Sequence, residues 1–412
     1  MSTEPSRYIV GIDLGTTNCA LAYIDTKELP KKKSEAAKIE TFAIPQLTNA
    51  GEVTDESLLP SFLYLPGQGE IAPDQLKLPW PSDKTYAVGK FAREHGGKTP
   101  TRLVASAKSW LCHPGIDRKG AILPIAAEPD FPKISPVQAE VRFLTHLRDA
   151  WNSRIAGKDA ASKLENQDIV LTVPASFDAV ARELTVEAAH AAGLTRVTLF
   201  EEPQAAFYSW IHHIGEAWRK SVKPGDAVLV VDVGGGTTDL TLVGVSDEGG
   251  DLTLTRIAVG DHLLLGGDNM DLALAHTAAA QLKDKLPKPD TAQMLGLWQA
   301  CRAVKETLLK DANAKPQPVT VLGRGTKLIG GTFKTELKRA DIDRVLVDGF
   351  FPNAPLEAEP HRQSAAGLQE LGLPYASDPA ITKHLASFLR RHSDQIKEVR
   401  GAKPGTLPTA VL

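Results

Sequence analysis

The prediction of the fold rests on the stretch Val228-Leu229-Val230-Val231-Asp232-Val233-Gly234-Gly235-Gly236-Thr237-Thr238-Asp239-Leu240. Its pattern predicts an apolar strand, a turn with three consecutive glycines, and a second strand. Glycines leave room for backbone N–H groups to surround an anion, and they adopt positive φ without strain. The carboxylates of Asp232 and Asp239 are oxygen donors of the kind that a hydrated Mg²⁺ prefers. This stretch therefore predicts a phosphate-binding hairpin with a metal beside it.

A second stretch repeats this plan near the N-terminus, Tyr8-Ile9-Val10-Gly11-Ile12-Asp13-Leu14-Gly15-Thr16-Thr17-Asn18-Cys19-Ala20-Leu21-Ala22-Tyr23-Ile24. Either stretch alone is also explained by an ordinary β-turn, because Asp-Gly and Gly-Thr turns are common. Two such hairpins half a chain apart favour two related lobes, each contributing one loop to a nucleotide bound between them.

Composition limits the class of protein and of partner. A chain of 412 residues is longer than one core usually supports, which also favours two lobes. The net charge of −3 and the isoelectric point near 6.4 indicate neither nucleic acid nor an anionic membrane as partner. We find no apolar run long enough to span a bilayer and no secretory signal. The cysteines Cys19, Cys112 and Cys301 have no metal-ligand spacing, so we expect a reducing, cytoplasmic compartment.

The remaining apolar patterns predict alternating strands and helices. Strands are expected at 41–47, 61–65, 168–173, 197–200, 252–259, 319–322 and 327–330. Helices are expected at 86–96, 135–155, 178–192, 204–218, 271–312, 339–350 and 381–392. Residues 48–90 indicate a small β-rich subdomain, 113–134 an irregular loop, and 408–412 the start of a strand, whereas 352–378 fit no element.

Two candidate site residues come from this pattern. The strand 197–200, which we expect to be buried, delivers Glu202 to the carboxyl edge of a sheet, where ligands bind in α/β proteins. Lys108 is a lone lysine, and composition alone would make it a surface residue.

Several motifs together resemble the nucleotide-binding domain of the seventy-kilodalton heat-shock chaperones. They follow that family's order and rough spacing from about Tyr8 to Leu412, as in a divergent, bacterial-type member. The motifs are Asp13-Leu14-Gly15-Thr16-Thr17-Asn18, Thr172-Val173-Pro174-Ala175-Ser176-Phe177-Asp178, Glu202-Pro203-Gln204-Ala205-Ala206, Asp232-Val233-Gly234-Gly235-Gly236-Thr237-Thr238-Asp239 and Leu265-Gly266-Gly267-Asp268-Asn269-Met270-Asp271.

The resemblance implies an α/β, actin-like ATPase fold. Each lobe would be built on a ribonuclease H-like mixed sheet with helices on both faces, and ATP or ADP would bind between the lobes. We expect lobe I at 1–221, with an inner part at 1–47 and 98–221 and an outer part at 48–97. Lobe II would span 222–412, with an inner part at 222–262 and 340–412 and an outer part at 263–339. The turn Lys223-Pro224-Gly225 would separate them.

The resemblance also implies site roles. Asp13 and Asp232 would hold Mg²⁺ through water, with K⁺ as a second candidate cation. Phosphate and nucleotide contacts would come from Gly15, Thr16, Thr17, Asn18, Gly234, Gly235, Gly236, Thr237, Gly266, Gly267 and Lys305. The attacking water would be positioned or activated by Lys108, Glu202, Asp239 and Thr237. Phosphoryl transfer needs charge neutralisation and in-line placement more than covalent help, which suits this set.

The family's function would be slow, Mg-dependent ATP hydrolysis coupled to a peptide-binding domain. Pro174 and Arg182 match the relay between nucleotide state and that domain, although alone they would read as a strand end and a solvated helix residue. The partners implied for the full-length protein are unfolded peptides and co-chaperones.

The sequence departs from the family in three places. On the adenine-side helix only Lys305 is retained, while Arg302, Glu306 and Leu309 differ. Segments 113–134 and 352–378 are longer than the family's connections. The chain also ends where the family continues into a glycine-pair strand, a linker and the peptide-binding domain. We therefore expect a fragment of a longer protein, with an incomplete adenosine wall and weak ATPase activity.

Three alternatives remain open at this point. A small-molecule kinase of the same superfamily would need a polar acceptor pocket, and we find no sugar-binding constellation. An actin-like filament or scaffold protein would use nucleotide only as a switch. A non-hydrolysing binding module is favoured by the altered adenine helix.

Overall fold

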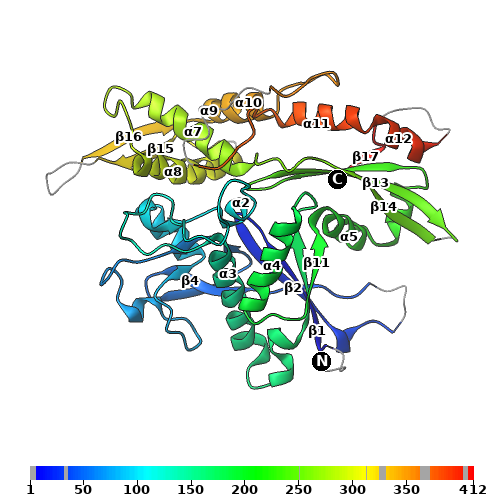
Figure 1. Cartoon of the computed structure of the whole chain (residues 1–412), viewed down its shortest axis with the longest axis horizontal. Helices are drawn as coiled ribbons and strands as arrows, with labels where there is room; N and C mark the ends of the chain where they lie inside the picture. The colour runs from blue at the N-terminus through cyan, green and yellow to red at the C-terminus, as the bar shows by residue number, and fades with distance from the viewer. Residues whose placement is uncertain are drawn as a thin grey trace.

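The structure is a computed structural model that describes residues 6–31, 36–249, 251–311, 313–323, 331–361, 372–401 and 407–412. It consists of two lobes, each built around a sheet with helices packed on it, stacked one above the other in Figure 1. The predicted α/β, two-lobed architecture is thereby confirmed. Among the described residues, no helix combines the length and apolarity needed to cross a membrane.

The first lobe is centred on a mixed sheet in the order β11-β10-β1-β2-β3, with β6 paired to β2. Its strands are β1 (Tyr8–Leu14), β2 (Asn18–Asp25), β3 (Glu40–Thr41), β6 (Leu59–Pro60), β10 (Asp168–Val173) and β11 (Val197–Glu201). The first hairpin is β1 and β2, and β10 runs parallel to β1 so that Thr172 lies opposite Asp13. The loop after β10 and the first hairpin therefore open at the same edge of the sheet.

Helices of the first lobe begin where capping residues predict. The helix α3 (Pro136–Trp151) starts at a capping box in which Ser135 and Gln138 exchange hydrogen bonds of 3.0 and 2.9 Å. The helix α4 (Ala179–Ala191) starts at Asp178, whose carboxylate accepts from the Ala181 amide at 2.6 Å. The other helices of this lobe are α1 (Lys90–Gly96), α2 (Ala107–Leu111), α5 (Glu202–Ile214) and α6 (Trp218–Ser221).

Two small sheets, β4-β5 and β8-β7-β9, lie beside the main sheet of the first lobe. Their strands are β4 (Ile44–Asn49), β5 (Glu52–Glu56), β7 (Leu63–Tyr64), β8 (Ala87–Val88) and β9 (Leu103–Val104). The predicted irregular segment 113–134 contains no helix and only an isolated bridge between Leu123 and Ile134.

The second lobe is centred on a sheet in the order β14-β13-β12-β17. Its strands are β12 (Ala227–Val233), β13 (Thr238–Glu248), β14 (Asp251–Val259) and β17 (Ala410–Val411). Strand alternation explains its two covered faces. Val228 and Val230 pack with Phe207 of α5, whereas Leu229 packs with Phe388 and Ile396 of α11 (Ile381–Arg391) and α12 (Ser393–Arg400). In Figure 1, α5 accordingly lies on the side of this sheet that faces the first lobe.

The remaining part of the second lobe is mainly helical. It contains α7 (Gly267–Gln281), α8 (Thr291–Lys310), β15 (Gln317–Leu322), β16 (Thr332–Leu337), α9 (Arg339–Ile342) and α10 (Asp348–Phe350), with a π-helical turn joining α9 to α10.

Several predicted boundaries were wrong for identifiable reasons. The helix expected over 271–312 is two helices, because Pro287 and Pro289 interrupt it and Asp290 caps the second. The partner of β15 is Thr332–Leu337; the strand predicted at 327–330 lies outside the described residues. The helix expected from Gln204 begins at Glu202 and ends at Ile214, short of the predicted Trp218.

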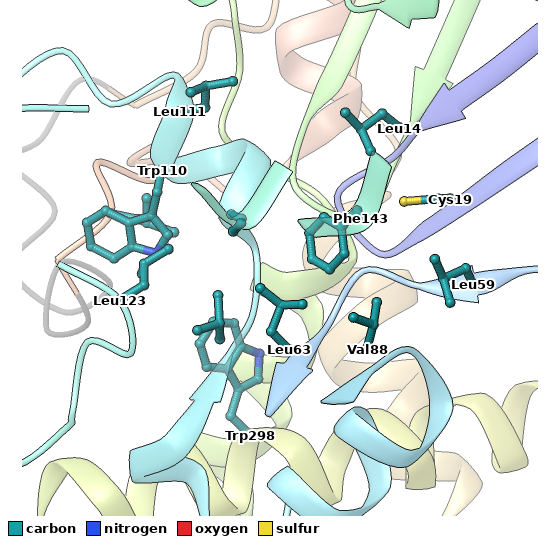
Figure 2. Packing of buried hydrophobic residues seen from close by; sticks show 14 of the residues in the cluster. Leu14, Cys19, Leu59, Leu63, Val88, Trp110, Leu111, Leu123, Phe143 and Trp298 are labelled. Atoms are coloured by element: carbon teal, nitrogen blue, oxygen red, sulfur yellow. The ribbon is translucent and has the colours of Figure 1, made fainter. Parts of the chain in front are cut away.

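Strand β11 was predicted to be buried, and this was wrong. It is the edge strand of its sheet, with β10 as its neighbour, and its residues are half-buried or exposed. One large core nevertheless joins the first lobe to the helical part of the second, whereas the second-lobe sheet packs in separate clusters. Figure 2 shows Leu14 and Cys19 of the first hairpin, Phe143 of α3 and Trp110 of α2 in the same cluster as Trp298 of α8.

We predict that replacing Phe207 with Ala lowers the free energy of unfolding by about 3–5 kcal/mol, because a fully buried aromatic side chain between the sheets is lost. Tyr208→Ala on the same helix is the matched control, since that side chain is 55% exposed, and should cost less than about 1 kcal/mol. Urea unfolding measures both. Equal losses would contradict the placement of α5.

Candidate functional site

The candidate site is built around an ion pair between Lys108 of α2 and Glu202 at the start of α5. The Lys108 Nζ lies 2.7 Å from Glu202 Oε1, and both side chains are largely buried. Burial alone would lower the pKa of Lys108, but the carboxylates of Glu202 and Asp13 outweigh it and raise that pKa above its usual value. Lys108 is therefore a buried, fixed positive charge, and not the surface residue that composition suggests.

Two aspartates, Asp13 and Asp232, interact with the charge of Lys108, and Asp239 adjoins Asp232. Asp13 lies at the end of β1, where its Oδ1 accepts from Thr172 Oγ1 at 3.0 Å. Asp232 and Asp239 are opposite each other across the second hairpin. Burial, together with the negative charges of Asp239 and Asp13, raises the pKa of Asp232. Negative charge thus exceeds positive charge here, which favours a bound cation.

The two glycine hairpins touch each other. A Cβ built on Gly235 would lie 1.7 Å from Thr17 Oγ1, and one built on Gly236 would lie 2.9 Å from Thr16 Cγ2. Only glycine allows this approach. The same Gly236 Cβ would lie 2.4 Å from the hydroxyl of Ser109, which is buried and, among the described residues, has no hydrogen-bond partner. The hairpin glycines and the following threonines therefore form one surface contributed by both lobes.

The other predicted nucleotide contacts border this surface. Gly15 must also be glycine, because a Cβ there would lie 2.5 Å from the Asn18 carbonyl oxygen. The start of α7 contacts the second hairpin, and the Gly267 amide donates to the Gly234 carbonyl at 3.0 Å. Gly266 faces the carbonyl oxygens of Gly234 and Gly235.

Lys305 and Arg302 belong to a buried charge network between α7 and α8. Lys305 Nζ lies 2.7 Å from Asp271 Oδ1 and donates to the Gly267 carbonyl at 3.2 Å. Arg302 donates to Asp268 at 2.5 Å and to Asp271 at 2.7 Å, and all three side chains are at most 6% exposed. Arg302, a departure from the family pattern, therefore neutralises two buried carboxylates of α7.

A serine ties this network to the first lobe. Ser106 Oγ donates to Asp268 Oδ2 at 2.5 Å. Ser106 caps α2 with φ of 54°, a conformation that costs a non-glycine residue on the order of 1 kcal/mol. Because Lys108 lies two residues further on, this contact connects the position of Lys108 to α7.

Asp239 is held by hydroxyl groups on both oxygens. Thr237 Oγ1 donates to Oδ2 at 3.1 Å, and Ser176 Oγ makes a short hydrogen bond to Oδ1. Ser176 Oγ also lies 2.7 Å from His262 Nδ1. Neither Ser176 nor His262 was predicted as a site residue.

The predicted relay residues lie at the edge of the first sheet. Arg182 of α4 donates to the carbonyl of Ala175 and to Glu201 at 3.1 Å, and its distance to the Pro174 carbonyl oxygen is 3.5 Å. Arg256 of β14, in the second lobe, pairs with the same Glu201. Glu201 is thus shared by arginines of both lobes.

Glu140 is a buried carboxyl group near Lys108 that sequence reasoning missed. It lies on α3 with 2% exposure, and its Oε2 has no partner among the described residues. Burial raises the pKa of Glu140 to about 8, and the charge of Lys108 acts in the opposite direction. Its position in the middle of an apolar helix face was the only available sign, and helix periodicity cannot distinguish such a residue from a solvated one.

Comparison with known families agrees with this geometry. A model of the family described as Hsp70 protein matches residues 93–351, which is more than half of the chain.

We predict that Arg302→Ala lowers the free energy of unfolding by about 3–5 kcal/mol, because Asp268 and Asp271 would lose a buried partner. Arg154→Ala is the matched control: its pair with Asp55 is 46% exposed on both sides and should contribute at most about 1 kcal/mol. Denaturant unfolding would contradict the network if the two losses were similar.

We also predict that Glu140→Gln stabilises the protein at alkaline pH. The folded-state pKa of Glu140 is raised, so the contribution of the protonated Glu140 to stability is fully present below the unfolded pKa near 4.5. That contribution is lost as pH rises through about 8. The variant should gain on the order of 3 kcal/mol at pH 8 and nothing at pH 4. Unfolding midpoints measured across this range test it, and a constant difference would contradict it.

Proposed function

This chain belongs to the Hsp70 protein family, whose members are ATPases, and we propose that it binds ATP or ADP with Mg²⁺ between its lobes and hydrolyses ATP slowly. The observation that carries the proposal is the buried amine of Lys108, paired with Glu202 and close to Asp13. An amine held in this way is suited to neutralise charge on a transferring phosphoryl group.

The donor set fits Mg²⁺. Asp13 and Asp232 are oxygen donors on the two hairpins, and repulsion between them is relieved when a cation binds. Among the described residues, no three carboxylate, imidazole or thiol groups converge tightly enough to ligate an ion directly. Mg²⁺ would therefore be held partly through water, as is usual for this ion, and K⁺ could offset further negative charge. When bound, Mg²⁺ would neutralise charge on the phosphates.

The protein's own residues would bind the phosphates and place the attacking water. Gly235, Gly236, Thr16 and Thr17 would approach the phosphates with backbone N–H groups, while the Gly234 amide closes the turn by donating to the Thr237 carbonyl at 2.8 Å. The unpartnered Ser109 hydroxyl would supply one more donor at Gly236. Asp239 and Glu202 would orient the attacking water, and Thr237 would stand beside the terminal phosphate.

Nucleotide entry would require the lobes to separate. Gly235 and Thr17 are in direct contact and leave no space for a phosphate between them. Closing again on the nucleotide would exclude water from the reaction, and we propose this cycle as the motion that a peptide-binding domain would sense.

We propose the division into lobes at 1–221 and 222–412, with outer parts at 48–97 and 263–339, on the extent of the two sheets. Arg182, Pro174 and Glu201 would relay the cycle, since Arg256 of the opposite lobe shares Glu201. Unfolded peptides and co-chaperones are the proposed partners of a full-length protein. The unpaired cysteines support the proposed cytoplasmic location.

We predict that Lys108→Ala lowers the single-turnover rate of ATP hydrolysis about 100-fold or more, while the Kd for Mg²⁺–ATP changes much less, because the amine acts on charge that develops during transfer. Lys119→Ala is the control, since its pair with Glu187 is exposed. Calorimetry and single-turnover assays measure both variants. Absence of Mg²⁺–ATP binding by the wild type would overturn the proposed function.

A further inference from the structure

The side chain of Asp239 is embedded in a hydrogen-bond chain that ends on an imidazole. Ser176 Oγ lies between Asp239 Oδ1 and His262 Nδ1, at 2.7 Å from the latter. Thr237 donates to the other carboxylate oxygen at 3.1 Å. Asp239 is 3% exposed, so these donors replace much of the water that would otherwise solvate it.

Counting protons shows which group donates in each hydrogen bond of this series. An ionised carboxylate only accepts, so the single hydroxyl proton of Ser176 is directed at Asp239. The Ser176 oxygen then accepts from His262, which must carry its proton on Nδ1. Burial lowers the pKa of His262, so that neutral imidazole with one proton is the form present at pH 7. The chain therefore runs from His262 through Ser176 to Asp239.

The hydrogen-bonded residues come from opposite lobes. Ser176 follows β10 of the first lobe, Asp239 lies on β13, and His262 lies between β14 and α7. The charged groups that act on His262 are Asp239, Asp178, Lys108 and Arg118, and the Phe177 ring contacts it edge-on. The hydroxyl that fixes Asp239 can reach it only while the lobes are together.

We propose that Ser176, held by His262, is a positioning residue that aligns Asp239 for hydrolysis when the lobes close. This inference rests on the proposed function. It adds Ser176 and His262 to the site and explains why closure of the lobes would affect the rate of ATP hydrolysis. With both oxygens of Asp239 bound by hydroxyls, the plane of the carboxylate is fixed. When the lobes separate, Asp239 loses one of these two donors.

The test compares Ser176→Ala with the conservative Ser176→Thr, and His262→Leu with His262→Asn, whose amide nitrogen can occupy the place of Nδ1. Ser221→Ala is the control, because that hydroxyl is exposed and bonds only within its own segment, to the Ala217 carbonyl. For each variant, the Kd for Mg²⁺–ATP and the single-turnover hydrolysis rate are measured on protein shown to be folded by circular dichroism.

We expect Ser176→Ala and His262→Leu to lower the hydrolysis rate about 10–100-fold, with the Kd within about threefold of wild type. Ser176→Thr and His262→Asn should recover most of the rate. A wild-type rate in folded Ser176→Ala, or equal loss in the alanine and threonine variants, would overturn the positioning role alone. A wild type that does not bind Mg²⁺–ATP would instead overturn the proposed function, and this inference with it.

Discussion

The direct contact between the two glycine hairpins is the constraint on which the rest of the structure depends. Gly235 and Gly236 of the second lobe lie against Thr17 and Thr16 of the first, closer than any side chain would permit. This contact brings Asp13 and Asp232 to a common space, with the Lys108–Glu202 pair near both aspartates. The charge balance of the site follows, because the first lobe contributes Lys108, Glu202 and Asp13 and the second contributes Asp232 and Asp239.

Contacts at several points hold the lobes in this relation. Ser106 reaches Asp268, Ser176 reaches Asp239, and Arg256 reaches Glu201. His113 and Trp110 of the first lobe also contact Gly372 of the second. The Ser176–Asp239 contact involves a predicted site residue, so motion of the lobes changes the surroundings of Asp239 directly.

Local patterns predicted much of the fold, and tertiary contacts account for what they missed. The hairpin strands, the caps at Ser135 and Asp178 and the helix near Ile381 depend on neighbours in sequence, and the structure has them as predicted. The interruption of the helix before Thr291 also has a local cause, Pro287 and Pro289. The helical pattern on either side nevertheless led to the prediction of one continuous helix. The edge position of β11 depends on the order of strands, which no segment reveals by itself.

The site residues also fall into those that local motifs predicted and those that depend on tertiary contacts. The motifs located Lys108, Glu202, Asp232 and Asp239, and the structure brings these residues together. Ser176 was inside a quoted motif, yet its partner Asp239 is 63 positions away. Glu140 could not be predicted because its importance lies in burial, and a glutamate on a helix is usually solvated.

The buried network around Arg302 also limits how this sequence can change over evolutionary time. An arginine that neutralises Asp268 and Asp271 cannot be exchanged alone, because any intermediate with one partner missing would be destabilised. Substitutions at these three positions should therefore appear together in descendants of this chain.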